Sequence, residues 1–161
     1  ITMMEGGRRT REAGIHGNCT WIMGYPGETL DDLKTTVAFI RWQEETYTAG
    51  REPGSPEQEA ARRAVNKSMF TATAYPGTEM FSDPGVKKVL CEEFNLRFDP
   101  ETGRPVPDEA MHYYVLQLDD ATKVLFNRDG RPLNYSAMPP EVFMEARSHV
   151  DRGEIFRILE M

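Results

Sequence analysis

Short apolar runs alternate with amphipathic segments along most of the chain. Residues 15–23 and 67–74 are two apolar runs of strand length, and each ends at a Tyr-Pro-Gly turn. Between these runs, Leu33, Val37 and Ile40 recur at helical spacing and predict an amphipathic helix. Strand, helix and strand in this order predict a βαβ unit with parallel strands and a right-handed crossover. The pattern therefore predicts an α/β protein.

The remaining segments predict further helices and loops. Helices are predicted over residues 1–13, 29–47, 57–65, 83–94 and 140–152. Residues 48–56 have the composition of a linker, and residues 155–159 form a short apolar tail that we expect to be docked. Residues 111–118 and 123–127 fit either two strands or one broken helix. We favour the strands, joined as a hairpin across residues 119–122.

Composition narrows the class of protein. The chain has 161 residues, the size of one ordinary domain, and 39% of them are hydrophobic, which is enough for a packed core. A net charge of −7 argues against non-specific binding to nucleic acid or to an anionic membrane. No apolar run approaches the roughly 20 residues of a membrane span. The two cysteines lie far apart and form no disulfide framework, so a reducing, cytoplasmic location is expected.

The stretch from residue 17 to residue 29 combines a strand, a tight turn and the start of a helix. Its turn places two glycines around Tyr25 and Pro26, so the backbone there can approach another group closely. In α/β folds, ligands bind at the carboxyl ends of the strands. Glu28 is expected to act structurally, as an anion in the first turn of the following helix, where it contributes about 0.3–1 kcal/mol.

The residues around both turns resemble the radical S-adenosylmethionine superfamily. Residues 24–29 (GYPGET) follow an apolar strand and precede an amphipathic helix, as does the glycine–apolar–Pro-Gly-Glu-Thr element of that family's MiaB/NifB-type core. Residues 73–80 (TAYPGTEM) are similar to the family's downstream Pro-Gly-Thr segment. The combination is similar to the cobalamin-dependent branch, which includes the Mg-protoporphyrin IX monomethyl ester oxidative cyclases and several methyltransferases.

The resemblance implies only one part of the family's catalytic domain. The family's CxxxCxxC motif, which binds a 4Fe–4S cluster in the first half of a partial barrel, is absent from this chain. The chain would then be the second half of a partial (β/α) TIM-like barrel with a C-terminal α+β extension. Residues 1–82 would belong to the barrel, with a surface insert at 48–66, and residues 83–161 would form the extension. Cys19 and Ala74 depart from the family, which usually has a bulky apolar residue and often a proline at these places.

The same resemblance implies a cofactor pocket at the two strand ends. The residues that it places at the S-adenosylmethionine and substrate pocket are Ile22, Gly24, Tyr25, Pro26, Gly27, Thr73, Ala74 and Tyr75. Ile22 would border the adenine by apolar contact, and glycine at position 24 would keep a side chain out of the way. No catalytic residue and no metal ligand is assigned within the chain.

The resemblance implies that the chain is one part of a radical S-adenosylmethionine enzyme. The parent protein would use S-adenosylmethionine, a 4Fe–4S cluster and, within the cobalamin-dependent branch, cobalamin. Its reaction would be a radical-based oxidative cyclisation or methylation of a small-molecule substrate. This chain alone would be inactive, because the cluster ligands are not in it. Its partner would be the N-terminal half of the same polypeptide.

Other reactive side chains have simpler interpretations. His16, His112 and His149 are scattered without the spacing of metal ligands, so they are expected at the surface or hydrogen-bonded in the core. Cys19 and Cys91 are expected to be small buried residues rather than redox-active thiols.

A second function stays open on the sequence alone. In it, the chain is a self-contained α/β module that binds a ligand or partner without catalysis, and the two turns are only tight connections. Residues 1–7 nevertheless resemble the middle of a longer sequence rather than a start.

The half-barrel that the resemblance implies would expose strand edges and apolar faces. We therefore expect the isolated chain to self-associate.

Overall fold

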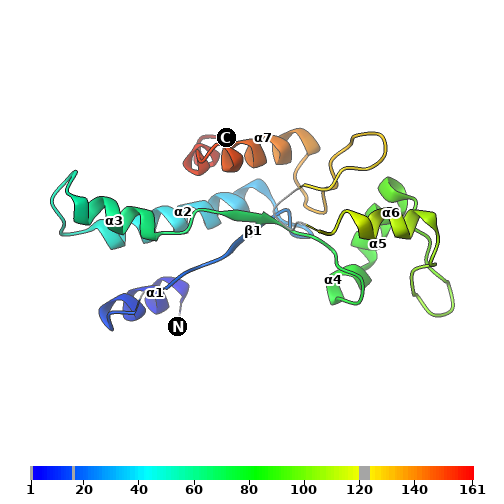
Figure 1. Ribbon diagram of the computed structural model, residues 1–161, viewed down its shortest axis with the longest axis horizontal. Coiled ribbons are helices and arrows are strands. Elements are labelled where there is room, and N and C mark those ends of the chain that lie inside the picture. The colour runs from blue at the N-terminus through cyan, green and yellow to red at the C-terminus, as the bar shows by residue number, and fades with distance from the viewer. Residues whose placement is uncertain (1, 16, 120–123) are drawn as a thin grey trace. The chain divides into compact units, whose positions relative to one another are not determined.

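The computed structural model describes residues 2–15, 17–119 and 124–161 (Figure 1). Its elements are α1 (Met3–Glu12), β1 (Trp21–Met23), α2 (Leu30–Thr48), α3 (Pro56–Ala64), β2 (Met69–Thr71), α4 (Glu79–Ser82), α5 (Pro84–Phe94), α6 (Glu109–Leu116), α7 (Pro140–Asp151) and the 3₁₀ helix η1 (Ile155–Glu160). β1 and β2 pair in parallel as a two-stranded sheet. The α/β class is confirmed, with helix as the main component.

Side-chain caps explain why the predicted helices begin where they do. The Thr2 hydroxyl accepts a hydrogen bond from Glu5 N at 3.2 Å at the start of α1. Ser55 accepts from Gln58 N at 3.1 Å at the start of α3. The Asp83 carboxylate accepts from two backbone amides of α5, whose first residue is a proline. Each cap satisfies amides that the helix itself leaves unpaired. All five predicted helices are confirmed.

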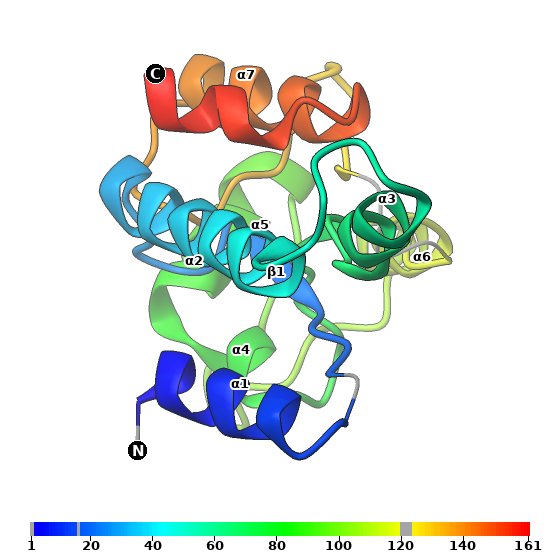
Figure 2. The same ribbon diagram turned by 90° about the vertical axis from the view of Figure 1, so that its left-hand side faces the viewer.

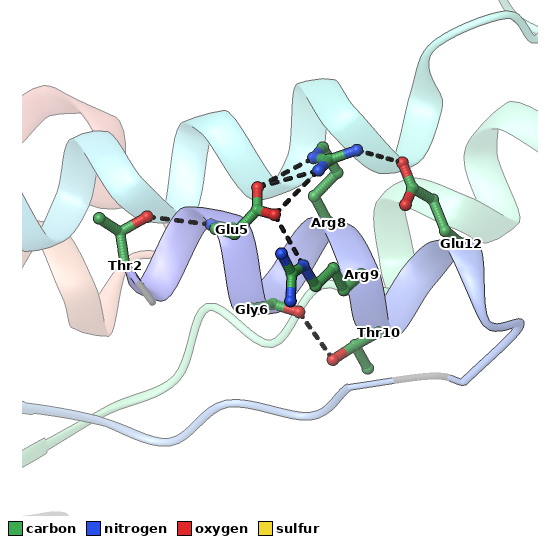
Figure 3. Close-up of polar contacts among 7 residues, drawn as sticks. All are labelled: Thr2, Glu5, Gly6, Arg8, Arg9, Thr10 and Glu12. Atoms are coloured by element: carbon green, nitrogen blue, oxygen red, sulfur yellow. Dashed lines mark hydrogen bonds and ion pairs between the residues drawn. The ribbon is translucent and has the colours of Figure 1, made fainter.

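Oppositely charged side chains form ion pairs on the surface of α1 (Figure 3). The Glu5 carboxylate pairs with Arg8 at 3.0 Å and with Arg9 at 2.7 Å, and Arg8 also pairs with Glu12 at 2.6 Å. Exposed pairs of this kind contribute little stability each. α1 buries no residue completely, so its own packing is weak.

The two strands are shorter than predicted. The predicted strand over residues 15–23 is reduced to β1, and that over 67–74 to β2. Side-chain hydrogen bonds explain why the residues just before Trp21 are not part of β1. The Asn66 side-chain amide nitrogen donates to Cys19 O at 2.9 Å, and Trp21 Nε1 donates to Asn66 O at 2.8 Å. These bonds satisfy backbone groups that a strand ladder would otherwise pair.

The predicted hairpin over residues 111–127 is wrong at its first strand. Residues 111–116 of that predicted strand lie in α6, which the Asp108 carboxylate caps by accepting a hydrogen bond from Met111 N at 3.0 Å. Tyr114 is buried while its neighbours Val115 and Leu116 are exposed, a pattern that helical periodicity explains and an alternating strand does not. Residues 120–123, where most of the turn was expected, lie outside the described residues.

Tertiary contacts divide the chain into two compact units. The first unit comprises residues 1–21, 31–69 and 145–161, and the second comprises residues 22–30 and 70–144. Both units are discontinuous in sequence. The division at residue 82 rests on the resemblance and stays a prediction.

The first unit is built on α2. The buried face of α2 carries Leu33, Val37 and Ile40, in agreement with the helical spacing in the sequence. The 3₁₀ helix η1 lies beside α7 in both ribbon views (Figures 1 and 2), and its Ile155 and Ile158 are buried. The predicted docking of this tail is therefore confirmed.

The second unit has its own apolar core. In Figure 1, α4, α5 and α6 gather together, and α4 and α6 both contact α5. The core residues are Ala74, Phe81, Val86, Leu90, Phe94, Leu96, Tyr114, Leu125, Leu133 and Tyr135. None of the helices in the described part of the chain combines the length and apolarity needed to cross a bilayer.

Candidate functional site

The two Tyr-Pro-Gly segments form the same kind of turn. Glu28 N donates to Tyr25 O at 2.9 Å, and Thr78 N donates to Tyr75 O at 3.1 Å. The third residue of each turn is a glycine with a positive φ, 79° at Gly27 and 89° at Gly77. Proline at the second position, a positive φ at the third and this hydrogen bond define a type II β-turn. Both turns follow the carboxyl ends of the two parallel strands.

Glu28 holds the first turn closed. Its Oε2 atom accepts a hydrogen bond from Gly24 N at 2.6 Å. A carboxylate that accepts a backbone N–H forms a strong, charge-assisted hydrogen bond. Glu28 lies before α2, whose first turn carries Asp31 and Asp32 instead, so the role expected for it as an anion in that turn is not borne out. Its carboxylate instead binds the end of the preceding strand, a contact between nearby residues that the sequence pattern does not indicate.

Gly24 makes room for a core side chain. A Cβ atom at this position would lie 2.8 Å from Phe143 Cε2, and the φ of Gly24 is 79°. Phe143 is completely buried. Glycine is therefore required here by the packing of Phe143, whatever binds at the strand ends.

A loop before α7 connects the two turns. Tyr135 O accepts from Gly27 N at 3.4 Å, and Ala137 N donates to Glu28 O at 2.9 Å. On the other side, the Tyr135 hydroxyl lies 3.3 Å from the Tyr114 hydroxyl, which donates to Ala74 O at 2.6 Å. Tyr135 thus bonds the first turn through its backbone and reaches the second strand end through Tyr114.

The tyrosine pair is the most strongly perturbed titratable group at this site. Burial raises the pKa of Tyr114 to about 12. Burial, together with the neighbouring Tyr114, also raises the pKa of Tyr135 well above its ordinary value. Both phenols are therefore neutral and act as hydrogen-bonding groups at neutral pH. Neither tyrosine is among the predicted site residues, because an aromatic residue in an apolar pattern gives no sign of such a pairing.

The structure brings the predicted site residues together at the paired strand ends. Ala72 N donates to Met23 O at 2.8 Å, so the residues after each strand begin side by side. Ile22 is 52% exposed, Tyr25 58% and Tyr75 37%, which leaves three large side chains open to a ligand. Ala74 is buried, and its carbonyl is occupied by Tyr114.

The remaining predicted site residues differ in how far they are exposed to solvent. Pro26 and Thr73 are half-buried, whereas Gly27 is exposed. Within the described residues, Ile22, Tyr25, Pro26, Gly27, Thr73 and Tyr75 therefore present surface, and Gly24 and Ala74 serve the packing beneath.

No metal centre is present among the residues that the structure describes, where no three His, Cys, Asp or Glu side chains gather as ligands. Cys19 is half-buried and Cys91 is exposed, so the predicted burial of the cysteines is wrong for Cys91. His112 is exposed, and His149 Nδ1 lies 3.6 Å from a Glu154 carboxylate oxygen. His16 lies outside the described residues.

Comparisons of the chain with protein-family models, with curated proteins and with solved structures found no match. Any functional assignment therefore depends on the residues and their geometry.

The tyrosine pair predicts a measurable stability effect. Tyr114→Phe removes the hydroxyl that donates to Ala74 O and leaves that buried carbonyl without this partner. We expect a loss of about 1–3 kcal/mol in the free energy of unfolding, measured by urea denaturation. Tyr113→Phe is the matched control, because its ring packs on Phe94 and it lies on the same helix. Equal effects of the two substitutions would contradict the role of the Tyr114 hydroxyl.

Proposed function

We propose that this chain supplies the second half of a radical S-adenosylmethionine enzyme's TIM-like barrel. In this proposal β1 and β2 are neighbouring barrel strands, and their turns form part of the S-adenosylmethionine and substrate pocket. The observation that carries the proposal is the pair of type II Tyr-Pro-Gly turns after two adjacent parallel strands. Ligand sites of α/β barrels lie at this end of the strands.

The exposed residues fit a flat, partly apolar ligand. Ile22 offers an apolar face at the strand end, and Tyr25 and Tyr75 offer aromatic surface on either turn. The Gly24 amide is bonded to Glu28, so it is not the donor that a purine would use. We therefore assign adenine recognition to the Ile22 side chain and to the exposed turn residues.

The described residues do not fit an iron–sulfur cluster. Such clusters are usually held by three or four thiolates, and this chain has two cysteines, which belong to different units. The cluster ligands are therefore assigned to the N-terminal half of the polypeptide. In the parent enzyme, S-adenosylmethionine and the cluster would supply the radical that starts oxidative cyclisation or methylation. Cobalamin is proposed only with the cobalamin-dependent branch. Free thiols and an oxygen-sensitive cluster suit the reducing cytoplasm.

The first test uses the complete reading frame that encodes this chain. We expect the protein, expressed anaerobically, to bind iron and to give a reduced 4Fe–4S signal in electron paramagnetic resonance. The signal should change when S-adenosylmethionine is added. An iron-free protein without such a signal would overturn the proposal and favour the module without catalysis.

Site variants test the assigned strand ends. In the complete enzyme, Ile22→Asp places a charge where apolar contact with adenine is proposed, and we expect the KM for S-adenosylmethionine to rise at least about tenfold. Leu116→Asp on α6 is the matched control, because Leu116 is also exposed and apolar and lies on the face of α6 opposite the buried Tyr114. An unchanged KM in Ile22→Asp, with the control also unchanged, would contradict the assignment.

A further inference from the structure

We propose that the first unit contains a binding cavity for a small aromatic molecule that donates one hydrogen bond. The cavity has a volume of about 230 Å³ and is lined by α1, by the segment before β1 and by α2. The lining residues that carry the argument are Gly6, Gly7, Cys19, Phe39, Trp42 and Gln43. None of the lining residues is among the residues predicted at the strand ends, and the inference does not depend on the proposed function.

Two glycines keep the α1 side of the cavity open. Gly6 and Gly7 lie in the middle of α1, where glycine weakens a helix relative to alanine. A Cβ atom at Gly6 would meet nothing within 4 Å, and one at Gly7 would lie 3.4 Å from the Trp42 ring. The Gly6 carbonyl accepts from Thr10 Oγ1 at 2.8 Å (Figure 3). The missing side chain of Gly6 therefore leaves free volume on this side of the cavity, whereas Gly7 lets the helix backbone lie close to the Trp42 ring.

Gln43 supplies the polar end of the cavity. Its side chain is on the buried face of α2, and the residue is only 6% exposed. Its Nε2 atom lies 3.5 Å from the Tyr47 hydroxyl and 3.7 Å from Cys19 Sγ, with Nε2 as the donor. Its Oε1 atom is buried and has no hydrogen-bond partner among the described residues. A buried acceptor in this state favours a ligand with an O–H or N–H group.

Aromatic rings form the apolar wall. The Phe39 and Trp42 rings lie with centroids 5.3 Å apart and planes inclined at 35°. Aromatic rings attract a further ring in offset-stacked or edge-to-face arrangements. A one- or two-ring molecule fits the measured volume, and its donor would pair with Gln43 Oε1 once the side-chain amide turns toward the ligand. Phenol has these two properties, and toluene has only the first.

The test compares phenol with toluene by NMR titration of the ¹⁵N-labelled chain. We expect phenol to shift the Trp42 indole N–H and the Gln43 side-chain amide in a saturable manner. Gln43→Met keeps an apolar lining but removes the acceptor, so the ratio of phenol to toluene affinity should fall about 2- to 10-fold. A ratio that does not change, or a phenol titration that leaves both signals in place, would overturn the proposal.

A second variant keeps the test decisive if Gln43→Met does not fold. Gly6→Leu fills the free volume and strengthens α1, so binding of both compounds should be lost while the spectrum stays folded. Met4→Leu is the matched control, because it places the same side chain on α1 at an exposed residue. Equal phenol affinity in Gly6→Leu and in the control would show adventitious surface binding and overturn the proposal.

Discussion

Replacing Gly24 by alanine is expected to destabilise the chain by about 2–5 kcal/mol. Two causes combine. The φ of 79° lies in the left-handed region, which costs a residue with a Cβ roughly 1–2 kcal/mol. The new methyl group would also lie 2.8 Å from Phe143 Cε2 in the core, and overpacking of this kind costs typically about 1–3 kcal/mol. Urea denaturation followed by circular dichroism measures the change.

Gly27→Ala separates the two causes. Gly27 has the same φ of 79°, but nothing lies within 4 Å of the Cβ that alanine would add. Its cost should therefore be the backbone part alone, about 1–2 kcal/mol. In a Phe143→Leu background, which lacks the clashing ring edge, Gly24→Ala should cost less stability than it does in the wild type. Equal losses at positions 24 and 27 would contradict a role for Phe143.

Alkaline pH is expected to unfold the chain through the buried tyrosine pair. The pKa of Tyr114 is about 12 in the folded chain, against about 10 in the unfolded chain. Between these values the unfolded state loses a proton that the folded state retains, so raising the pH favours unfolding. The stability is present below pH 10 and is lost as the pH rises from 10 through 12, and Tyr114 alone accounts for a loss of about 2 kcal/mol by pH 12. Tyr135, whose pKa is also raised, adds to this loss.

The Tyr114→Phe/Tyr135→Phe double variant is the control for the alkaline effect. It should be less stable than the wild type at pH 8, yet its free energy of unfolding should depend much less on pH between 10 and 11.5. Urea titrations at fixed pH values in this window compare the two chains. A double variant with the wild-type pH dependence would contradict the assignment to this pair.

Residue preferences over a few neighbouring positions are sufficient to predict much of the backbone conformation at the site. The Tyr-Pro-Gly turns need only proline at the second position and glycine at the third, and both turns are formed. The capping residues Ser55 and Asp83 likewise act on amides two or three residues away. Such interactions are decided within a few residues, so a sequence pattern can predict them.

Contacts between distant residues could not be predicted in this way. Asn66 bonds the Cys19 carbonyl across 47 positions and shortens the predicted first strand. Tyr114 bonds Ala74 across 40 positions, although the sequence pattern favours a strand for the helix that carries Tyr114. Their partners depend on which surfaces meet after folding, and apolar periodicity does not contain that information.

By itself, therefore, the sequence determined the α/β class, five helices and the two turns that end the strands. Short-range steric and hydrogen-bonding preferences set these features. Only the tertiary structure decided the lengths of the strands, the helical state of α6, the tyrosine pair behind the turns and the cavity beside Gln43. Each of these depends on desolvation and packing between segments far apart in the chain, where burial outweighs local preference.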